Sequence, residues 1–366
     1  MDFFTKVDLP STDLQIDYKS KIAFFGSCFA DNISAQFASR KFKVLANPFG
    51  TVYNPLSAAM QIKAIANGKN FGEKDVFQDT RGTWYCWDAH GSLSGKSREE
   101  CIDKLNAAVH EARNFLQNTD VVFITLGTAF VYFLKDSGIA VSNCHRQDPN
   151  MFIRKMISVD HAAEALKNIV RELQKIKRDG ILRLQASPSA QDDKSEEGSE
   201  SHEFHIVFTV SPLRHMSDGA HNNTLSKATL QLAINKVIQE IAEANQTCAS
   251  RNTTVTNPGQ SQQNPAFVEY FPSYEIVMDE LRDYRFYDSD MIHLSKTAEE
   301  YIFERMAETY CNEKTREDIK QVEKFLKSAN HRIQDANSPA TAAFLQKLHA
   351  EAARLESQIA GLELIV

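Results

Sequence analysis

KIAFFGSCFADN, residues 21–32, is the stretch around which the rest of the chain is arranged. The apolar run from Ile22 to Phe25 is typical of a buried parallel strand, and Gly26-Ser27-Cys28 is typical of a sharp turn into a helix. Such a turn lifts a side chain out of the sheet and places it at a helix N-terminus, where free N–H groups can stabilise an oxyanion. The turn is therefore a candidate position for a nucleophile, although an ordinary strand-to-helix junction has the same pattern.

Apolar runs alternate with amphipathic stretches along most of the chain. Further strands are predicted at 42–46, 121–127, 204–210 and 267–271, and helices at 31–41, 56–67, 98–116, 158–177, 226–245 and from 296 onward. Strands that alternate with long helices form a mostly parallel sheet with helices on both faces. The sequence therefore predicts an α/β fold, a three-layer doubly wound sheet of about five mainly parallel strands.

Several segments interrupt or extend this pattern. Residues 68–98 are rich in glycine and hold both tryptophans, which indicates a loop-rich excursion, and a later hairpin is predicted to turn at 136–138. Residues 185–202 have almost no apolar content, which predicts a disordered surface insertion. Residues 313–366 predict a helical hairpin appended to a domain of residues 1–312, either packed on it or used for self-association.

The composition excludes several classes of protein. The 41 basic and 48 acidic residues give a net charge of −7, so no nucleic-acid partner is expected. No export signal and no apolar run of the roughly 18 residues that a membrane span needs are present, so we expect a cytoplasmic protein without a membrane partner. Its six cysteines are scattered without a CxxC pair, which favours free thiols and no metal site. No dinucleotide fingerprint or P-loop follows a strand, so no cofactor is expected.

Asp290-Met291-Ile292-His293 is the second informative stretch. An aspartate three residues before a histidine can accept the proton of Nδ1, fix the tautomer and make the imidazole a usable general base. By itself this spacing is also typical of surface polarity or a helix cap. Because it follows the last predicted strand, we expect it at the same end of the sheet as the turn after the first strand.

The sequence resembles the GSCFA family. The resemblance rests on motifs in the family's order, Gly26-Ser27-Cys28-Phe29-Ala30, Asn47-Pro48-Phe49-Gly50, Thr125-Leu126-Gly127-Thr128-Ala129, Asn143-Cys144-His145, Ser211-Pro212-Leu213-Arg214-His215 and the Asp290/His293 pair. It covers about residues 1–310. The family looks like a branch of the SGNH/GDSL hydrolases, which implies a flavodoxin-like five-stranded sheet. It also implies hydrolysis or transfer of acyl groups on esters of lipids, sugars or thioesters.

The resemblance assigns roles residue by residue. The nucleophile of the GDSL-type register falls on Cys28, with Ser27 where those enzymes have aspartate, whereas by residue type the nucleophile is Ser27. We favour Cys28, since a thiol at a helix N-terminus is expected to have a lowered pKa. Asp290 and His293 match the catalytic aspartate and histidine of the hydrolases.

The oxyanion-binding residues match less completely. Gly50 resembles the glycine that follows the second strand, and Gly127-Thr128-Ala129 replaces the usual Gly-x-Asn, so the side-chain amide donor is missing. Its role falls to Thr128, to Asn143 or to no residue, and the loss of one such donor costs roughly a hundredfold in rate.

Two further candidates lie beside these motifs. His145 is a candidate pocket-lining residue, because adjacent residues on an extended segment point to opposite faces and Cys144 cannot easily pair with it. Arg214 ends a core strand, where it can bind a carboxylate or phosphate of the substrate or form a salt bridge between loops.

The sequence therefore favours an esterase or acyltransferase acting on a small acyl ester or thioester, with a carbohydrate as one candidate carrier of the acyl group. The alternative is a catalytically weak or inactive module that binds an acyl or glycan ligand, favoured by the replaced aspartate and the missing amide. A third hypothesis makes residues 313–366 an oligomerisation arm, so that the protein is a homo-oligomer.

Overall fold

The structure is a computed structural model of the 366-residue chain, and it describes residues 5–185, 204–251, 267–330 and 338–364. At its centre lies a parallel sheet of β1 (Lys21–Gly26), β2 (Lys43–Ala46), β5 (Val121–Leu126), β9 (His205–Val210) and β10 (Phe267–Tyr270). The spatial order is β10-β9-β5-β1-β2. In chain order this is 2-1-3-4-5, so the direction of winding reverses between β1 and β5, where α/β proteins usually place a ligand.

Each core strand follows one of the apolar runs of the sequence. All six residues of β5 and of β9 are buried, as expected for parallel strands covered on both faces. β1 pairs with β5 from Ile22–Val121 to Gly26–Thr125, which brings the ends of these two strands side by side. The predicted α/β fold with five parallel strands is confirmed.

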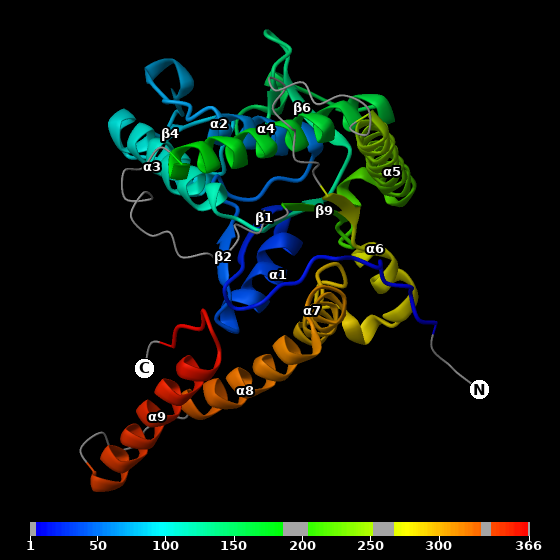
Figure 1. Cartoon of the computed structure of the whole chain (residues 1–366). Coiled ribbons are helices and arrows are strands. Elements are labelled where there is room, and N and C mark those ends of the chain that lie inside the picture. Colours follow the sequence, from blue (N-terminus) through cyan, green and yellow to red (C-terminus); the bar gives the residue numbers. More distant parts are fainter. Residues whose placement is uncertain (1–4, 186–203, 252–266, 331–337, 365–366) are drawn as a thin grey trace.

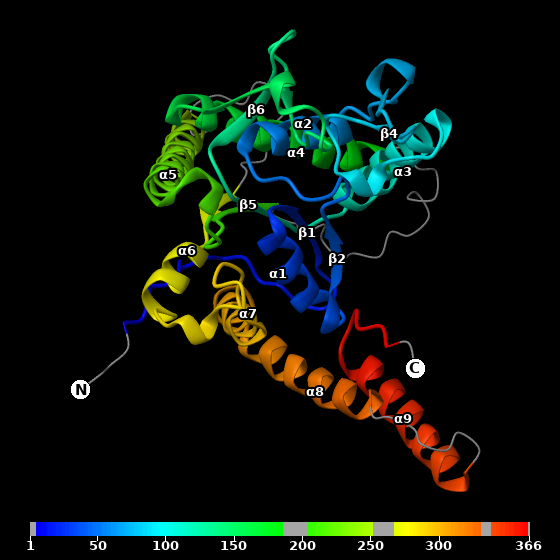
Figure 2. The ribbon, with the colours of Figure 1, turned by 180° about the vertical axis from the view of Figure 1, so that it is seen from behind.

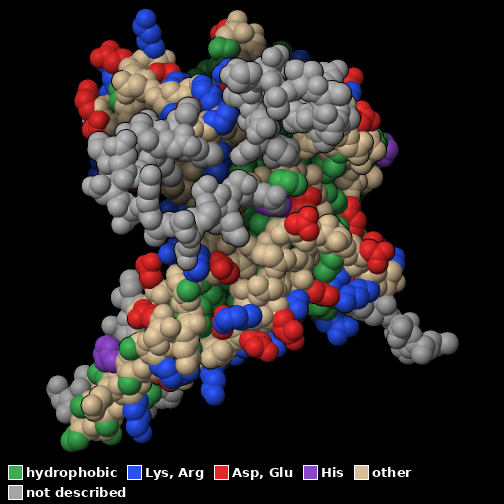
Figure 3. All heavy atoms as spheres, viewed as in Figure 1, with side chains coloured by type: hydrophobic (Ala, Val, Ile, Leu, Met, Phe, Trp, Pro, Cys, Tyr) green, Lys and Arg blue, Asp and Glu red, His purple; other side chains and the backbone are tan. Residues whose placement is uncertain are grey.

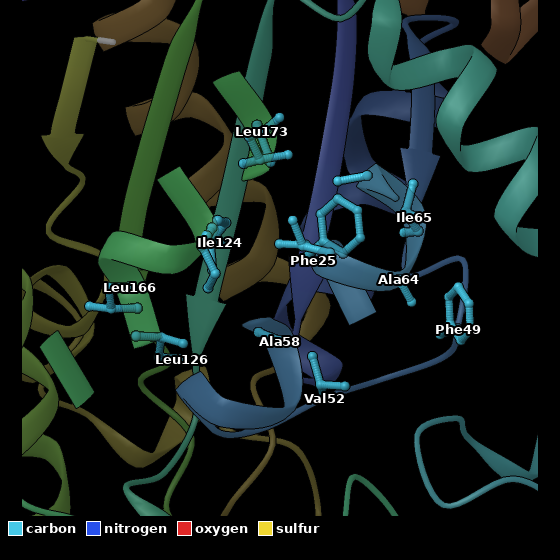
Figure 4. Close-up of a cluster of buried hydrophobic side chains, with 14 of the residues drawn as sticks. Phe25, Phe49, Val52, Ala58, Ala64, Ile65, Ile124, Leu126, Leu166 and Leu173 are labelled. Atoms are coloured by element: carbon cyan, nitrogen blue, oxygen red, sulfur yellow. The ribbon is translucent and has the colours of Figure 1, made fainter. Parts of the chain in front are cut away.

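Alternate residues of β1 face two separate hydrophobic layers. Phe25 points into the layer under α2 (Pro55–Ala66), α3 (Arg98–Gln117), α4 (Val159–Gln185) and α5 (Ala220–Arg251), together with Ile124, Leu166 and Leu173 (Figure 4). Phe24 faces the opposite layer under α1 (Cys28–Ser39) and α7 (Lys296–Tyr310), where its ring stacks on Phe123 with 5.0 Å between centroids. The two groups of helices cover opposite faces of the sheet (Figures 1 and 2).

The C-terminal helices α8 (Glu313–Ala329) and α9 (Pro339–Gln358) pack on the second layer at their near end. Val322 and Phe325 belong to the same hydrophobic cluster as Phe37 of α1, and the Arg40 guanidinium lies 2.6 Å from the Glu323 carboxylate. The far end of the hairpin projects away from the sheet (Figure 1), and acidic and basic side chains are interspersed over the visible surface (Figure 3). Self-association through this hairpin and a domain boundary at residue 312 stay predictions.

Smaller sheets and helical turns lie outside the central sheet. β3 (Phe77–Gln78) pairs with β4 (Trp84–Tyr85), and β6 (Phe130–Leu134) pairs with β7 (Ala140–Val141) and β8 (Phe152–Met156), all antiparallel. The hairpin turning at 136–138 is thus confirmed, whereas β8 was not predicted. A short helix α6 (Ser273–Glu275) follows β10 and continues as a π-helical turn, and 3₁₀ turns occur at Glu73–Asp75, Gly91–Leu93, Pro149–Met151, Met216–Asp218 and Tyr284–Phe286.

Two helices extend further than their sequence patterns predicted. α5 begins at Ala220 and not at 226; its first residues are mostly polar and lack the apolar periodicity that predicts a helix. α4 continues past 177 through Gly180, which packs closely on Gln117 of α3. The predicted insertion begins at Gln185, the last residue of α4, and otherwise lies outside the described residues.

No helix in the described ranges has both the length and the apolar character needed to cross a membrane. The expected cytoplasmic location stays a prediction.

Candidate functional site

The turn after β1 depends on Gly26. Its φ is +142°, and a Cβ on it would lie 2.1 Å from the carbonyl oxygen of Thr125 in β5. Only glycine tolerates both this backbone conformation and this close approach. Ser27 then caps α1 in an extended conformation, and Cys28 is the first helical residue.

Asn47, at the end of β2, holds this turn from one side. Its Oδ1 accepts a hydrogen bond from the Gly26 N–H (2.8 Å), and its Nδ2 donates to the carboxylate of Asp31 in the first turn of α1 (2.6 Å). The N–H of Val52 donates to the Gly26 carbonyl (2.8 Å). The segment after β2 is therefore hydrogen-bonded to both the N–H and the carbonyl of Gly26, the residue at the turn after β1.

The same loop also reaches the end of β5. The carbonyl of Tyr53 accepts hydrogen bonds from the N–H groups of Gly127 (2.7 Å) and Thr128 (2.8 Å). The loops after β2, β1 and β5 thus meet at the point where the winding of the sheet reverses. We call this meeting point the junction.

Lys227 of α5 supplies a buried cation next to this junction. It is 1% exposed, and its Nζ donates to the carbonyls of Gly127 (2.6 Å) and Ser211 (2.7 Å). Burial lowers the pKa of Lys227 to about 7, and the nearby Cys28 thiol opposes this by raising it. Lys227 was not found by sequence reasoning, because it lies within an amphipathic helix and in no motif.

His215, which follows β9, faces the same junction. Its ring meets the Tyr53 ring edge to face at 5.5 Å, and its Nε2 would lie 3.1 Å from a Cβ on Gly127. Burial, together with the charge of Lys227, lowers the pKa of His215 to about 4. His215 is therefore neutral near pH 7.

The two candidate nucleophiles have different environments. Ser27 is 1% exposed, and its buried Oγ has no hydrogen-bond partner in the described structure. Cys28 is only partly buried, and the N–H groups of Phe29 and of Cys28 itself approach its Sγ. Cys28 is thus the more accessible side chain.

The prediction of a lowered pKa for Cys28 was wrong. Burial raises the pKa of the thiol and outweighs the helix N–H groups and the charge of Lys227, which lower it, while Asp31 adds to the rise. The helix N-terminus is therefore insufficient here to make Cys28 a thiolate at neutral pH.

Asp290 and His293 form the expected hydrogen-bonded pair. Nδ1 of His293 lies 2.5 Å from Oδ2 of Asp290, while Oδ1 accepts the N–H groups of Ile292 (2.9 Å) and His293 (2.8 Å). These bonds, the one to the His293 side chain most of all, lower the pKa of Asp290 to about 2. Both side chains are about half exposed, at 47% and 50%, and the Nδ1 bond leaves Nε2 of the imidazole available as a base.

The pair lies on the loop that leads into α7, and α7 contacts α1. Glu299, in the first turn of α7, accepts a hydrogen bond from the side chain of Asn32 (2.5 Å). Leu294, next to His293, is buried in the hydrophobic cluster against which Cys28 packs. Within the described ranges, no hydrogen bond or ion pair joins the Asp290–His293 pair to Ser27 or Cys28.

The expected oxyanion donors are already engaged. The N–H of Gly50 donates to the Asn47 carbonyl (2.7 Å) within a tight turn, and those of Gly127 and Thr128 donate to Tyr53. The hydroxyl of Thr128 is bonded to that of Ser226 (3.0 Å). The N–H groups of Gly50, Gly127 and Thr128 therefore already have protein acceptors, and a role of these residues in oxyanion binding stays a prediction.

Asn143 and His145 lie in a separate aromatic cluster. His145 is 6% exposed, its Nε2 contacts the Cys86 carbonyl (2.8 Å), and its ring lies 4.5 Å from that of Tyr85. The Asn143 side chain accepts the His145 N–H (2.8 Å). In this same cluster the Trp87 ring stacks on Phe77 at 3.8 Å, so these residues pack the loop-rich excursion.

Arg214 is exposed beside the junction. Its guanidinium lies 3.8 Å from the sulfur of Met278, and its charge helps to lower the pKa of Lys227. Across the described residues, no three His, Cys, Asp or Glu side chains gather closely enough to hold a metal ion.

Comparison with known proteins identifies the family. The GSCFA family model matches residues 21–195 and 196–306, which include the β1 turn, Lys227 and the Asp290–His293 pair. Searches of curated proteins and of solved structures found no match. The matched segments make up most of the chain, and the protein belongs to the GSCFA family.

Proposed function

We propose that this protein is an SGNH-like hydrolase or acyltransferase in which Cys28 attacks an ester or thioester carbonyl. The observation that carries the proposal is the hydrogen bond between Asp290 and His293. The pair lies on the loop that leads into α7, and α7 is hydrogen-bonded to α1, the helix that Cys28 opens at the carboxyl end of β1. An oriented imidazole near a nucleophile at a helix N-terminus is the arrangement that acyl transfer requires.

In the first step, the Cys28 sulfur bonds to the carbonyl carbon while Nε2 of His293 removes the thiol proton. A general base is needed because burial raises the pKa of this thiol, so it is protonated at neutral pH. Asp290 keeps the imidazole in the productive tautomer and stabilises its protonated form. The N–H groups of Cys28 and Phe29, which as the first two of α1 have no intrahelical acceptor, stabilise the oxyanion.

The tetrahedral intermediate then collapses. The bond from carbon to the leaving oxygen or sulfur breaks, and the imidazolium of His293 returns its proton to the leaving group. Water, or an acceptor alcohol in a transferase, next attacks the Cys28 thioester while His293 takes the attacking proton. Release of the acid or new ester returns the proton to sulfur and restores the thiol.

The contrast between Ser27 and Cys28 favours the thiol. Attack requires a side chain that can reach substrate, and Ser27 is 1% exposed whereas Cys28 is partly exposed and touches the helix N–H groups. The sulfur must come within hydrogen-bond distance of His293 when substrate binds, since catalytic bonds of this kind often tighten only in the complex.

A second candidate function is a binding module on the same fold. It is favoured by the engaged N–H groups of Gly50 and Gly127 and by the absence, in the described structure, of a bond between Cys28 and His293. In that case the junction holds an acyl or glycan ligand without turning it over.

Intact-protein mass after treatment with a fluorophosphonate or a chloroacetamide separates these functions. We expect an adduct in the wild type and in Ser27→Ala that is lost in Cys28→Ala and strongly slowed in His293→Ala. Cys144→Ala is the matched control, because Cys144 is another partly buried thiol, with a pKa raised by burial to about 11. Labelling of Cys28 no faster than that of Cys144, with no dependence on His293, would overturn the catalytic proposal and favour the binding module.

A further inference from the structure

A pocket of about 560 Å³ opens beside the Asp290–His293 pair. Its walls come from the segment after β9, from the turns after β10 and from the loop that carries Asp290, and they include Arg214, Met216, Arg282, Tyr284, Asp290 and Met291. Asp290 and Ile292 line the pocket, and Asp290 is bonded to His293, so a molecule bound here lies near the proposed base.

The arginines and carboxylates of this pocket are unequally paired. The carboxylate of Asp290 is held by His293, and that of Asp283 is bonded to Arg285 at 2.9 Å. Arg214 and Arg282 have no carboxylate partner among the described residues, and the contact of Arg214 is the Met278 sulfur. Two guanidinium groups are therefore free to bind an anion in a protein whose net charge is −7.

The same pocket also exposes large apolar side chains. Met216 is 48% exposed, Tyr284 73% and Met291 54%. Methionine and tyrosine side chains adapt to apolar chains and rings, whereas the planar guanidinium group binds carboxylate or phosphate through paired hydrogen bonds. The pocket thus combines an anion-binding part with an apolar part.

We propose that this pocket binds the part of the substrate that carries a carboxylate or phosphate on an apolar chain, held by Arg214 and Arg282. The substrate class is then an acidic ester or thioester, whose charged group enters the pocket while its carbonyl lies toward His293 and Cys28. This assignment of substrate rests on the proposed function, but binding of the anion in the pocket does not.

Calorimetric binding of 4-phenylbutyrate, 4-phenylbutyl phosphate and neutral 4-phenylbutan-1-ol tests the pocket without turnover. We expect at least one anion to bind tenfold or more tightly than the alcohol, and Arg214→Gln and Arg282→Gln each to weaken that anion tenfold or more. Arg285→Gln is the matched control, since Arg285 is on the same loop but is paired with Asp283. It should change the affinity less than twofold. These arginines are exposed, so the variants are expected to fold, which the circular dichroism spectrum checks.

The inference would be overturned if the anions and the alcohol bound equally tightly. It would also be overturned if Arg285→Gln weakened anion binding as much as Arg214→Gln and Arg282→Gln do. A second assay compares kcat/KM for mono-4-nitrophenyl glutarate and 4-nitrophenyl pentanoate, and we expect the acidic ester to be preferred tenfold and the preference to be lost in Arg214→Gln. If anions bind through both arginines but neither ester is cleaved, the pocket assignment stands and the proposed function fails. If both esters are cleaved without preference and anions do not bind, the proposed function stands and the pocket assignment fails.

Discussion

Replacement of Gly26 by alanine is expected to disrupt the pairing of β1 with β5 at the junction. The added Cβ would lie 2.1 Å from the Thr125 carbonyl oxygen, and the next atoms of Thr125, its carbonyl carbon and its nitrogen, lie at 2.9 Å. The obstacle is backbone in a central strand, which cannot rotate away as a flexible side chain can. β1 and β5 must therefore separate.

The cost has two parts. A non-glycine residue at φ +142° is strained by about 1–3 kcal/mol, and forcing apart a packed interior adds about 1–3 kcal/mol. The sum, about 2–6 kcal/mol, lowers the thermal midpoint; the shift per kcal/mol is smaller than that of chains of 150–250 residues, about 2–4 °C, because the unfolding entropy of this 366-residue chain is larger.

Gly138→Ala provides the matched control. Gly138 also has a positive φ, +68°, but a Cβ there would meet no atom within 4 Å. Only the backbone strain of about 1–2 kcal/mol applies to it. Thermal unfolding followed by circular dichroism should therefore show a clearly larger loss for Gly26→Ala. Equal losses in the two variants would refute the close approach of β1 and β5 on which the site is built.

Two further predictions concern the charges of the site. Asp290→Asn removes the carboxylate oxygen that accepts the Nδ1 hydrogen of His293 and fixes its tautomer. We expect ester cleavage or probe labelling to fall by about 10²–10⁴-fold, with an unchanged circular dichroism spectrum. A loss under threefold would refute the role of Asp290. Lys227→Met removes a cation whose folded-state pKa, about 7, lies below the 10.5 of the model amine. Between pH 7.0 and 8.5 the folded protein releases a proton that the unfolded wild type keeps, and over this range the unfolding free energy of the wild type should rise relative to the variant by roughly 1–2 kcal/mol. A difference in thermal midpoint between wild type and variant that does not change with pH would contradict this.

The central sheet was predictable because its information is local. VVFITL at 121–126 and HIVFTV at 205–210 are continuous apolar runs, and a strand buried on both faces leaves that signature. The Asp290–His293 pair was predictable for the same reason, since both partners lie within one turn of chain. The start of α5 was less predictable, because its first residues are mostly polar and carry no apolar periodicity.

The junction itself could not be predicted, because its contacts join distant parts of the chain. Lys227 is 100 residues from the Gly127 carbonyl to which it donates, and Asn47 is 21 residues from Gly26. The engagement of the expected oxyanion donors could not be predicted for a related reason. A glycine motif predicts a backbone shape, but whether the N–H of Gly50 is free depends on the acceptor that the fold brings to it.

The wrong pKa prediction for Cys28 and the unpredicted pKa of Lys227 have one cause, which is burial at the same junction. Burial favours the neutral form of each group, raising the pKa of the thiol and lowering that of the amine, while their mutual attraction favours the charged pair. At neutral pH the resting thiol is therefore uncharged and Lys227 is only partly protonated. When negative charge develops on the sulfur or the oxyanion, it raises the proton affinity of Lys227 and so recruits a cation at that moment. In the proposed reaction the buried lysine therefore stabilises the transition state more than the resting thiol, which is the distinction that catalysis requires.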